Sequence, residues 1–111
     1  MSAPKVSGHD IRKVILDNFN DIDTRFSNDD ILGYLKQINH YKMLDDVLDL
    51  EEQLLKMENS GLLRPIAQNF NTRYYRLWDT LEPTTCKSCN FVTYFAKVEV
   101  GKFCPQCKTS M

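Results

Sequence analysis

The spacing of apolar positions predicts two short helices near the start of the chain. A first helix is expected over residues 10–19, where apolar side chains recur at intervals of three and four residues. Ser27 is followed three residues later by Asp30, a variant of the capping box that marks the beginning of a helix. The apolar pattern after it predicts a second helix that ends near Ile38.

A third helix should begin at Lys42 or Leu44 and end at Ser60, where Gly61 can terminate it. Its apolar face on a helical wheel comprises Leu44, Val47, Leu48, Leu54 and Leu55, with Leu50 and Met57 on the flank. The opposite face carries four carboxylates and one ammonium, from Asp45, Asp46, Asp49, Glu52 and Lys56. Such a face would repel a polyanion. It is therefore expected to be a solvated exterior, a docking surface for a basic protein, or a helix that touches DNA only at its N-terminal end.

Two β-prone runs, residues 62–67 and 73–78, flank an asparagine-rich connector and predict a β-hairpin. Its three arginines are interleaved with aromatic residues, in the order Arg64, Phe70, Arg73, Tyr74, Tyr75, Arg76. Arginines beside aromatic rings suit contacts with a nucleic-acid backbone or stacking on single strands. The alternative is that the rings pack beneath the hairpin against the first helix, and we favour it for Trp78 and one tyrosine.

All four cysteines fall in two C-x-x-C pairs, and residues 90–103 separate the pairs; the cysteines are Cys86, Cys89, Cys104 and Cys107. Two such turns supply the four thiolates of a tetrahedral zinc site, at a spacing close to that of zinc ribbons. Because four protein ligands complete the coordination, we expect one structural Zn²⁺, which stabilises a segment too small to fold on apolar burial alone. Disulfides are less favoured, since the N-terminal residues show no apolar stretch after a basic segment, as a secretory signal would, and a cytoplasmic protein is expected.

The zinc segment should contain one short hairpin between the two cysteine pairs, with Gly101 and Lys102 at a turn. Asn90 follows the first pair, where a left-handed backbone is needed, and asparagine tolerates that conformation. The small core around the metal is expected to comprise Phe91, Val92, Tyr94, Phe95, Val98 and Phe103.

Charge is unevenly divided along the chain, although the net charge is only −1. Residues 1–60 carry twelve acidic and seven basic side chains, whereas residues 61–111 carry three acidic and seven basic ones. This asymmetry indicates that the two halves face different partners. An enzyme is not expected: His9 and His40 have no nucleophile context nearby, and no glycine-rich phosphate loop is present. No apolar run is long enough to cross a membrane.

Three helices followed by a β-hairpin is the order of a winged helix-turn-helix, an α+β fold. The stretch LLKMENSGLL is similar to the end of a recognition helix that leads into a wing strand. With CKSCNF and FCPQCK added, the chain resembles small, mainly archaeal, predicted regulators that fuse a winged helix to a C-terminal zinc ribbon. The resemblance implies a loose N-terminus (residues 1–8), a winged helix (9–80) and a zinc ribbon (81–111). A more distant likeness is to ferric-uptake-type repressors, whose histidine-rich regulatory metal sites this chain lacks.

We therefore expect a DNA-binding transcriptional regulator with a structural zinc ribbon. Its DNA contacts should come from the entrance of the third helix and from the wing, namely Asn39, His40, Tyr41, Lys42, Arg64, Arg73 and Arg76. The alternative is a protein-interaction adaptor, an accessory subunit of a transcription or replication assembly. It would dock through its ribbon and through Asp45, Asp46, Asp49 and Glu52. The sequence leaves a homodimer open.

Overall fold

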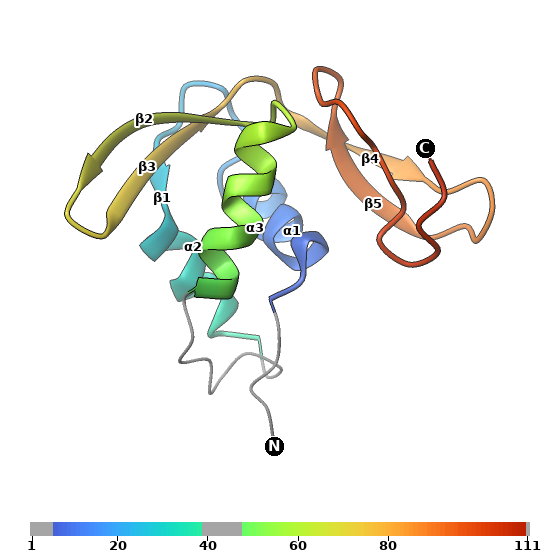
Figure 1. Cartoon of the computed structure of the whole chain (residues 1–111), viewed down its shortest axis with the longest axis horizontal. Helices are drawn as coiled ribbons and strands as arrows, with labels where there is room; N and C mark the ends of the chain where they lie inside the picture. Colours follow the sequence, from blue (N-terminus) through green and yellow to red (C-terminus); the bar gives the residue numbers. More distant parts are fainter. Residues whose placement is uncertain (1–5, 39–47, 111) are drawn as a thin grey trace.

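The computed structural model describes residues 6–38 and 48–110. Within these ranges the elements are α1 (Gly8–Asn18), β1 (Phe26–Ser27), α2 (Asn28–Leu35), α3 (Leu48–Asn59), β2 (Leu63–Asn69), β3 (Thr72–Leu77), β4 (Leu81–Thr85) and β5 (Val92–Ala96). The strands form two antiparallel sheets that lie on opposite sides of the helices (Figure 1). The predicted mixture of helices and a small hairpin is confirmed at this level.

The first helix begins two residues earlier than the sequence pattern predicts. Ser7 is its N-cap, and the Ser7 side chain accepts a hydrogen bond from the backbone N–H of His9 at 3.2 Å. Val6, just before the cap, is buried, and its N–H donates to the carboxylate of Asp49 at the start of α3. The end of the segment expected to be loose is therefore held by one side chain buried in the core and by one hydrogen bond to α3.

The second helix confirms its predicted beginning and corrects its end. Ser27 and Asp30 form a reciprocal capping box: Ser27 Oγ accepts from the N–H of Asp30 at 3.1 Å, and Asp30 Oδ2 accepts from the N–H of Ser27 at 2.9 Å. The helix ends at Leu35 and not near Ile38, because tighter turn hydrogen bonds follow, such as Ile38 N–H to Leu35 O at 3.0 Å.

Helix α3 is stopped as predicted but faces the core differently. Gly61 has φ +91°, a left-handed conformation that ends the helix at little cost for glycine. The side chains turned inward, at spacings of four and three residues, are Leu50, Leu54 and Met57. Leu55, predicted to be buried, is 53% exposed, so the apolar face is rotated from the expected one. The predicted beginning of this helix, including Leu44 and Val47, lies outside the described residues.

The three-stranded sheet has the order β1-β3-β2 and carries the hairpin predicted from the sequence. Strand β1 was not predicted; it has only two residues and pairs with β3 through Phe26 opposite Tyr75. Side chains alternate across the sheet, and those on the inner face pack against the helices. They join a core that comprises Val6, Ile11, Val14, Ile15, Phe26, Ile31, Leu35, Leu50, Leu54, Met57, Leu62, Leu63, Tyr75, Leu77, Leu81 and Ala96.

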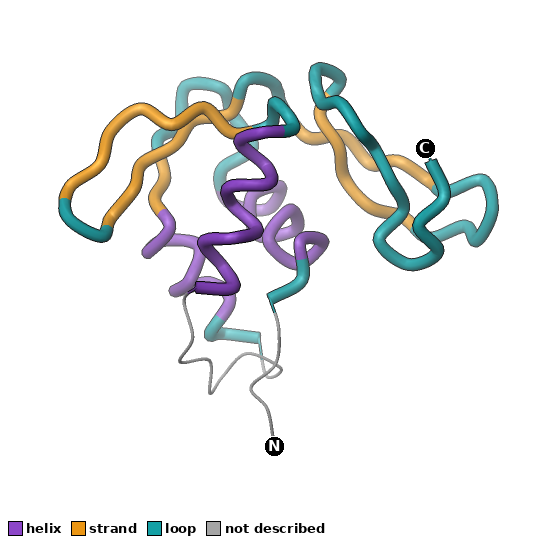
Figure 2. Tube along the Cα trace, in the orientation of Figure 1, coloured by secondary structure: helices purple, strands orange, loops and turns teal. Residues whose placement is uncertain are grey.

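The second sheet corrects the predicted position of the ribbon hairpin. Strand β5 pairs with β4, which precedes the first cysteine pair, so the hairpin encloses that pair and does not lie between the two pairs. We call residues 81–110 the cysteine unit (Figure 2, at the right). Its own core is smaller than expected, because Val92, Val98 and Phe103 are exposed. Its buried Leu81 and Ala96 instead belong to the core shared with the helices.

A buried ion pair joins the cysteine unit to the helices. The guanidinium of Arg12 on α1 donates to both carboxylate oxygens of Glu99, at 2.7 Å each, and the Glu99 side chain is only 1% exposed. Glu99 also accepts from the N–H of Ala96 at 2.9 Å and from Ser60 Oγ at 3.3 Å. Arg12 further donates to the backbone oxygen of Tyr94 at 2.9 Å. One carboxylate thus connects α1, the end of α3 and the end of β5.

We expect Glu99→Ala to destabilise the protein by about 3 kcal/mol, because it leaves the largely buried guanidinium of Arg12 without its counter-charge. Chemical denaturation followed by circular dichroism measures the change. The matched control is Asp17→Ala, which removes the exposed i,i+4 partner of Lys13 at 3.1 Å and should change the stability far less, because solvent screens this pair. Equal losses in the two variants would contradict the role given to Glu99.

Candidate metal centre and nucleic-acid surface

The four cysteines converge at one end of the cysteine unit. All four Sγ atoms lie within 4.8 Å of one another, and Cys86–Cys107 and Cys89–Cys104 are each separated by 3.5 Å. All four are free thiols, since these separations exceed a disulfide bond of about 2.05 Å. A tetrahedral zinc ion with Zn–S bonds of about 2.3 Å needs sulfur atoms about 3.8 Å apart. The cluster can therefore hold a metal ion.

The two C-x-x-C turns repeat the same backbone geometry. Asn90 and Lys108, the residues that follow each pair, have φ +62° and +65°. The N–H of each donates at 2.9 Å to the carbonyl oxygen of the first cysteine of its pair, Cys86 or Cys104. The left-handed conformation predicted for Asn90 is confirmed. Its counterpart at Lys108 was missed, because lysine does not signal that conformation as asparagine does.

Hydrogen bonding at the second pair favours the deprotonated sulfur that a metal requires. Cys107 Sγ lies 3.2 Å from Thr109 Oγ1, and this contact, with the backbone N–H of Thr109, lowers the pKa of the Cys107 thiol to about 6. Desolvation acts to raise the pKa of Cys104, but the N–H groups of Cys107 and Gln106 outweigh it and the pKa falls. The N–H of Gln106 lies 3.4 Å from Cys104 Sγ. A backbone hydrogen bond acts to lower the pKa of the Cys89 thiol, but desolvation and the side chains of the other three cysteines raise it to about 12, so the lowering is confined to the second pair. The four-sulfur donor set fits a cation that prefers thiolate ligands.

His9 lies where α1 meets the cysteine unit. Its Nδ1 is 2.9 Å from Thr93 Oγ1, and its ring stacks on Tyr94 and meets Phe91 edge-on, with centroid distances of 5.6 and 4.9 Å. Burial lowers the pKa of His9 below its usual 6.5, although Asp10 raises it. These contacts make His9 part of the joint between α1 and β5.

Two predicted nucleic-acid contacts lie side by side on the outer face of the three-stranded sheet. Arg64 on β2 is directly opposite Arg76 on β3, and both side chains are exposed. The Arg64 guanidinium lies over the ring of Trp78, 5.1 Å from its centroid. Trp78 is 55% exposed, so the prediction that it packs beneath the hairpin is wrong; Tyr75, by contrast, is buried as expected for one tyrosine. Trp78 follows β3 on the outward side of the alternation.

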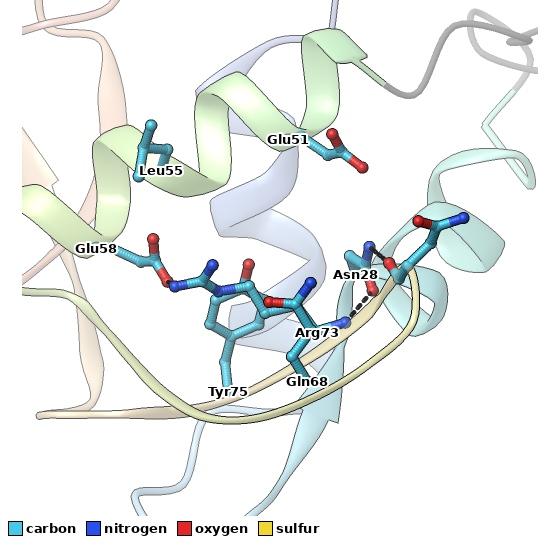
Figure 3. A pocket seen from close by; sticks show the side chains of 8 residues that line it. Asn28, Glu51, Leu55, Glu58, Gln68, Arg73 and Tyr75 are labelled. Atoms are coloured by element: carbon cyan, nitrogen blue, oxygen red, sulfur yellow. Dashed lines mark hydrogen bonds and ion pairs between the residues drawn. The ribbon is translucent and has the colours of Figure 1, made fainter.

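The third predicted arginine has a different environment. Arg73 points into a pocket of about 330 Å³ between α3 and the hairpin (Figure 3). Its guanidinium lies 2.7 Å from Glu58, whose side chain is 10% exposed. The approach lacks hydrogen-bond alignment, and Arg73 Nε has no hydrogen-bond partner within the described residues. The backbone N–H of Arg73 donates to Asn28 Oδ1 at 3.0 Å. Arg73 therefore ties the hairpin to α3 and α2.

The described part of α3 is acidic toward solvent. Glu51, Glu52 and Leu55 are exposed, and Lys56 lies 3.8 Å from Glu52. Asp49, predicted to lie on the acidic face of this helix, accepts a hydrogen bond from the N–H of Val6. Six further predicted contacts lie outside the described residues: Asn39, His40, Tyr41, Lys42, Asp45 and Asp46. Within the described ranges, no helix has the length and apolar character needed to cross a membrane.

Comparison with family models and with curated proteins gives no match. Among solved structures, the ferric uptake regulator from Francisella tularensis with iron is similar, with a TM-score of 0.49 and 20% identity; the match covers 86% of this chain and 70% of that chain. A structure described as prokaryotic transcription factors gives a TM-score of 0.43 and 22% identity over 76% of this chain and 66% of that one. Likenesses at this level identify no shared site or partner.

We expect one metal ion per chain, and Cys104→Ser should lose it because three thiolates remain. Elemental analysis by mass spectrometry measures the content. Since the cysteine unit shares its core with α1, the same variant should also unfold at a lower temperature. The matched control is Ser88→Ala, an exposed position within the first C-x-x-C turn, which should keep the metal. A folded wild-type sample with a stoichiometry near zero would rule out the metal centre.

Proposed function

We propose that this protein is a DNA-binding transcriptional regulator, with a winged helix-turn-helix over residues 9–80 and a zinc ribbon over residues 81–111. The observation that carries the proposal is the exposed pair formed by Arg64 and Arg76 on the hairpin. Neither arginine has a carboxylate within ion-pair distance among the described residues. Unpaired guanidinium groups on the outer face of the hairpin, near its base, suit contacts with DNA phosphates.

The order of elements supports the winged helix. A short strand β1 separates α1 from α2 and pairs with β3, and α3 runs directly into the hairpin that would be the wing (Figure 1). The entrance of the third helix, with Asn39, His40, Tyr41 and Lys42, remains a proposed contact, since a helix N-terminus favours phosphate. We give Arg73 a structural role, because it is paired with Glu58.

Zinc is the metal that we propose for the four cysteines. A tetrahedral set of thiolates favours zinc or iron–sulfur chemistry, and the paired C-x-x-C turns are those of structural zinc sites. With four protein ligands the ion would have no open position for water or substrate, so its role would be to hold the two turns together. The sequence from Cys86 to Lys108 would then depend on the ion for its shape.

Arg64→Gln and Arg76→Gln should each weaken binding to mixed-sequence duplex DNA. Each should also reduce the salt dependence by about one counterion, because one phosphate contact is lost. Salt-titrated fluorescence anisotropy with a labelled duplex measures both effects. Lys97→Gln is the matched control, since it removes one exposed positive charge in the cysteine unit. Unchanged affinity and salt slope in both arginine variants would remove the hairpin from the interface.

A protein-interaction adaptor is the second candidate, and one feature of α3 favours it. Leu55 is 53% exposed beside the exposed carboxylates of Glu51 and Glu52. An apolar side chain with acidic neighbours suits a partner that offers a small apolar contact within a basic rim. Asp45 and Asp46 would extend this surface, whereas Asp49 is engaged by Val6.

For an adaptor, reversing Glu51 and Glu52 to lysine should slow association with the partner at low salt and have little effect at high salt, because rim charges mainly set the encounter rate. Pull-down from native extract with the wild type and the double variant identifies the proteins concerned, and surface plasmon resonance gives the rates. For a DNA-only regulator, the same reversal should leave DNA affinity unchanged or raise it. If both forms recover the same proteins, the acidic face is a solvated exterior.

A further inference from the structure

The outer face of the three-stranded sheet carries a third arginine that the sequence pattern did not reveal. Phe26 pairs with Tyr75 and Arg64 pairs with Arg76. The same antiparallel register, continued by one residue, brings Arg25 beside Arg76. Arg25, which immediately precedes β1, Arg76 on β3 and Arg64 on β2 therefore form a row about 10 Å from end to end. All three side chains are exposed, whereas the neighbouring Phe26, Tyr75 and Leu63 face the core.

Two aromatic side chains flank this row. Tyr74 and Trp78 lie two residues to either side of Arg76 and share its outward side of β3, so rings and guanidinium groups alternate in steps of about 7 Å. Arg25 lies over the Tyr74 ring at 4.8 Å from its centroid, and Arg64 over Trp78 at 5.1 Å. We call these five residues the arginine–aromatic face. Cation–π stacking uses the flat side of a guanidinium and leaves its in-plane N–H groups free to meet an anion.

The positive charges of this face are not paired with carboxylates of the described residues. No carboxylate lies within ion-pair distance of Arg25, Arg64 or Arg76 among the described residues. The two arginines elsewhere in the fold differ, because Arg12 and Arg73 are each paired with a glutamate. The face is therefore the region where unpaired arginines gather in the described chain, and it lies across the sheet from the acid-lined pocket beside α3.

We propose that the arginine–aromatic face binds single-stranded nucleic acid. Guanidinium groups match phosphate oxygens, and the exposed ring of Trp78, with the half-buried ring of Tyr74 beside the row, matches the flat faces of unpaired bases. A duplex hides its base faces, and its major groove admits a helix or a two-stranded ribbon, not the broad side of three strands. An acidic protein could pair its carboxylates with the arginines, but it would offer no nucleic-acid base to stack on the exposed part of Trp78. The proposal shares Arg64 and Arg76 with the proposed DNA contact and rests on that function in this respect.

Trp78 makes the proposal directly testable, because it is the single tryptophan of the chain. The full chain is titrated with an oligothymidylate of about 16 nucleotides while tryptophan fluorescence is followed. A mixed-sequence duplex of the same length and a polyglutamate peptide serve as competing probes. Stacking should quench Trp78 with the single strand, and binding should weaken as salt rises.

Variants then separate the arginine–aromatic face from the hairpin in general. Arg25→Gln should weaken single-strand binding several-fold, and Trp78→Leu should weaken it about tenfold, measured by anisotropy of a labelled oligonucleotide. Lys97→Gln, with the same loss of charge in the cysteine unit, should bind as the wild type does. Circular dichroism confirms that each variant is folded.

The outcomes distinguish this inference from the function proposed above. Duplex binding that needs Arg64 and Arg76, without quenching and without an effect of Arg25→Gln, overturns the single-strand proposal and leaves the regulator standing. Single-strand binding with quenching, and little duplex binding, supports the single-strand proposal and overturns the regulator. Polyglutamate binding as tight as that of the oligonucleotide, or the absence of binding to any probe, overturns the single-strand proposal.

Discussion

The carboxylate of Glu99 is the interaction on which the arrangement of the two halves depends. It is buried and accepts one hydrogen bond from each terminal nitrogen of the Arg12 guanidinium. It also accepts hydrogen bonds from the N–H of Ala96 and the hydroxyl of Ser60. A buried charge is tolerated only when it is paired and its remaining lone pairs are satisfied. Glu99 meets both conditions with groups from α1, the end of α3 and the end of β5. Its geometry therefore fixes where the cysteine unit sits on the helices.

This joint makes the metal centre and the helical part mutually dependent. Arg12 also lies 4.7 Å from the ring centroid of Phe95, and His9 bonds to Thr93, so α1 is held along β5 at several points. If the cysteine unit were joined to the helices only by a flexible linker, loss of the ion would not change the stability of the helices. Here β4 and β5 contribute Leu81 and Ala96 to the core of the helices, so loss of the ion would destabilise both parts.

The two faces of the three-stranded sheet differ in charge, and this difference indicates which face can approach a polyanion. On the inner side, beside α3, Arg73 is paired with Glu58, and Glu51 lines the same pocket (Figure 3). On the outer side, Arg64 and Arg76 are exposed without a carboxylate partner among the described residues. A polyanion would be repelled from the first side and attracted to the second. The hairpin, and not the exposed side of α3, is therefore the better candidate for contact with nucleic acid.

Local signals in the sequence determined the capping box at Ser27, the helix stop at Gly61, the hairpin and the gathering of four cysteines, because each depends on neighbours a few residues apart or on metal chemistry that tolerates few alternatives. The burial and the contact partners of each side chain could be established only from the tertiary structure. Burial of Leu50 in place of Leu55, exposure of Trp78 and the pairing of Arg73 with Glu58 follow from how distant elements pack. The Arg12–Glu99 pair joins residues far apart in the chain, and the Arg25–Arg76–Arg64 row depends on strand register. No periodicity within a single segment encodes such contacts, so only the folded arrangement decided them.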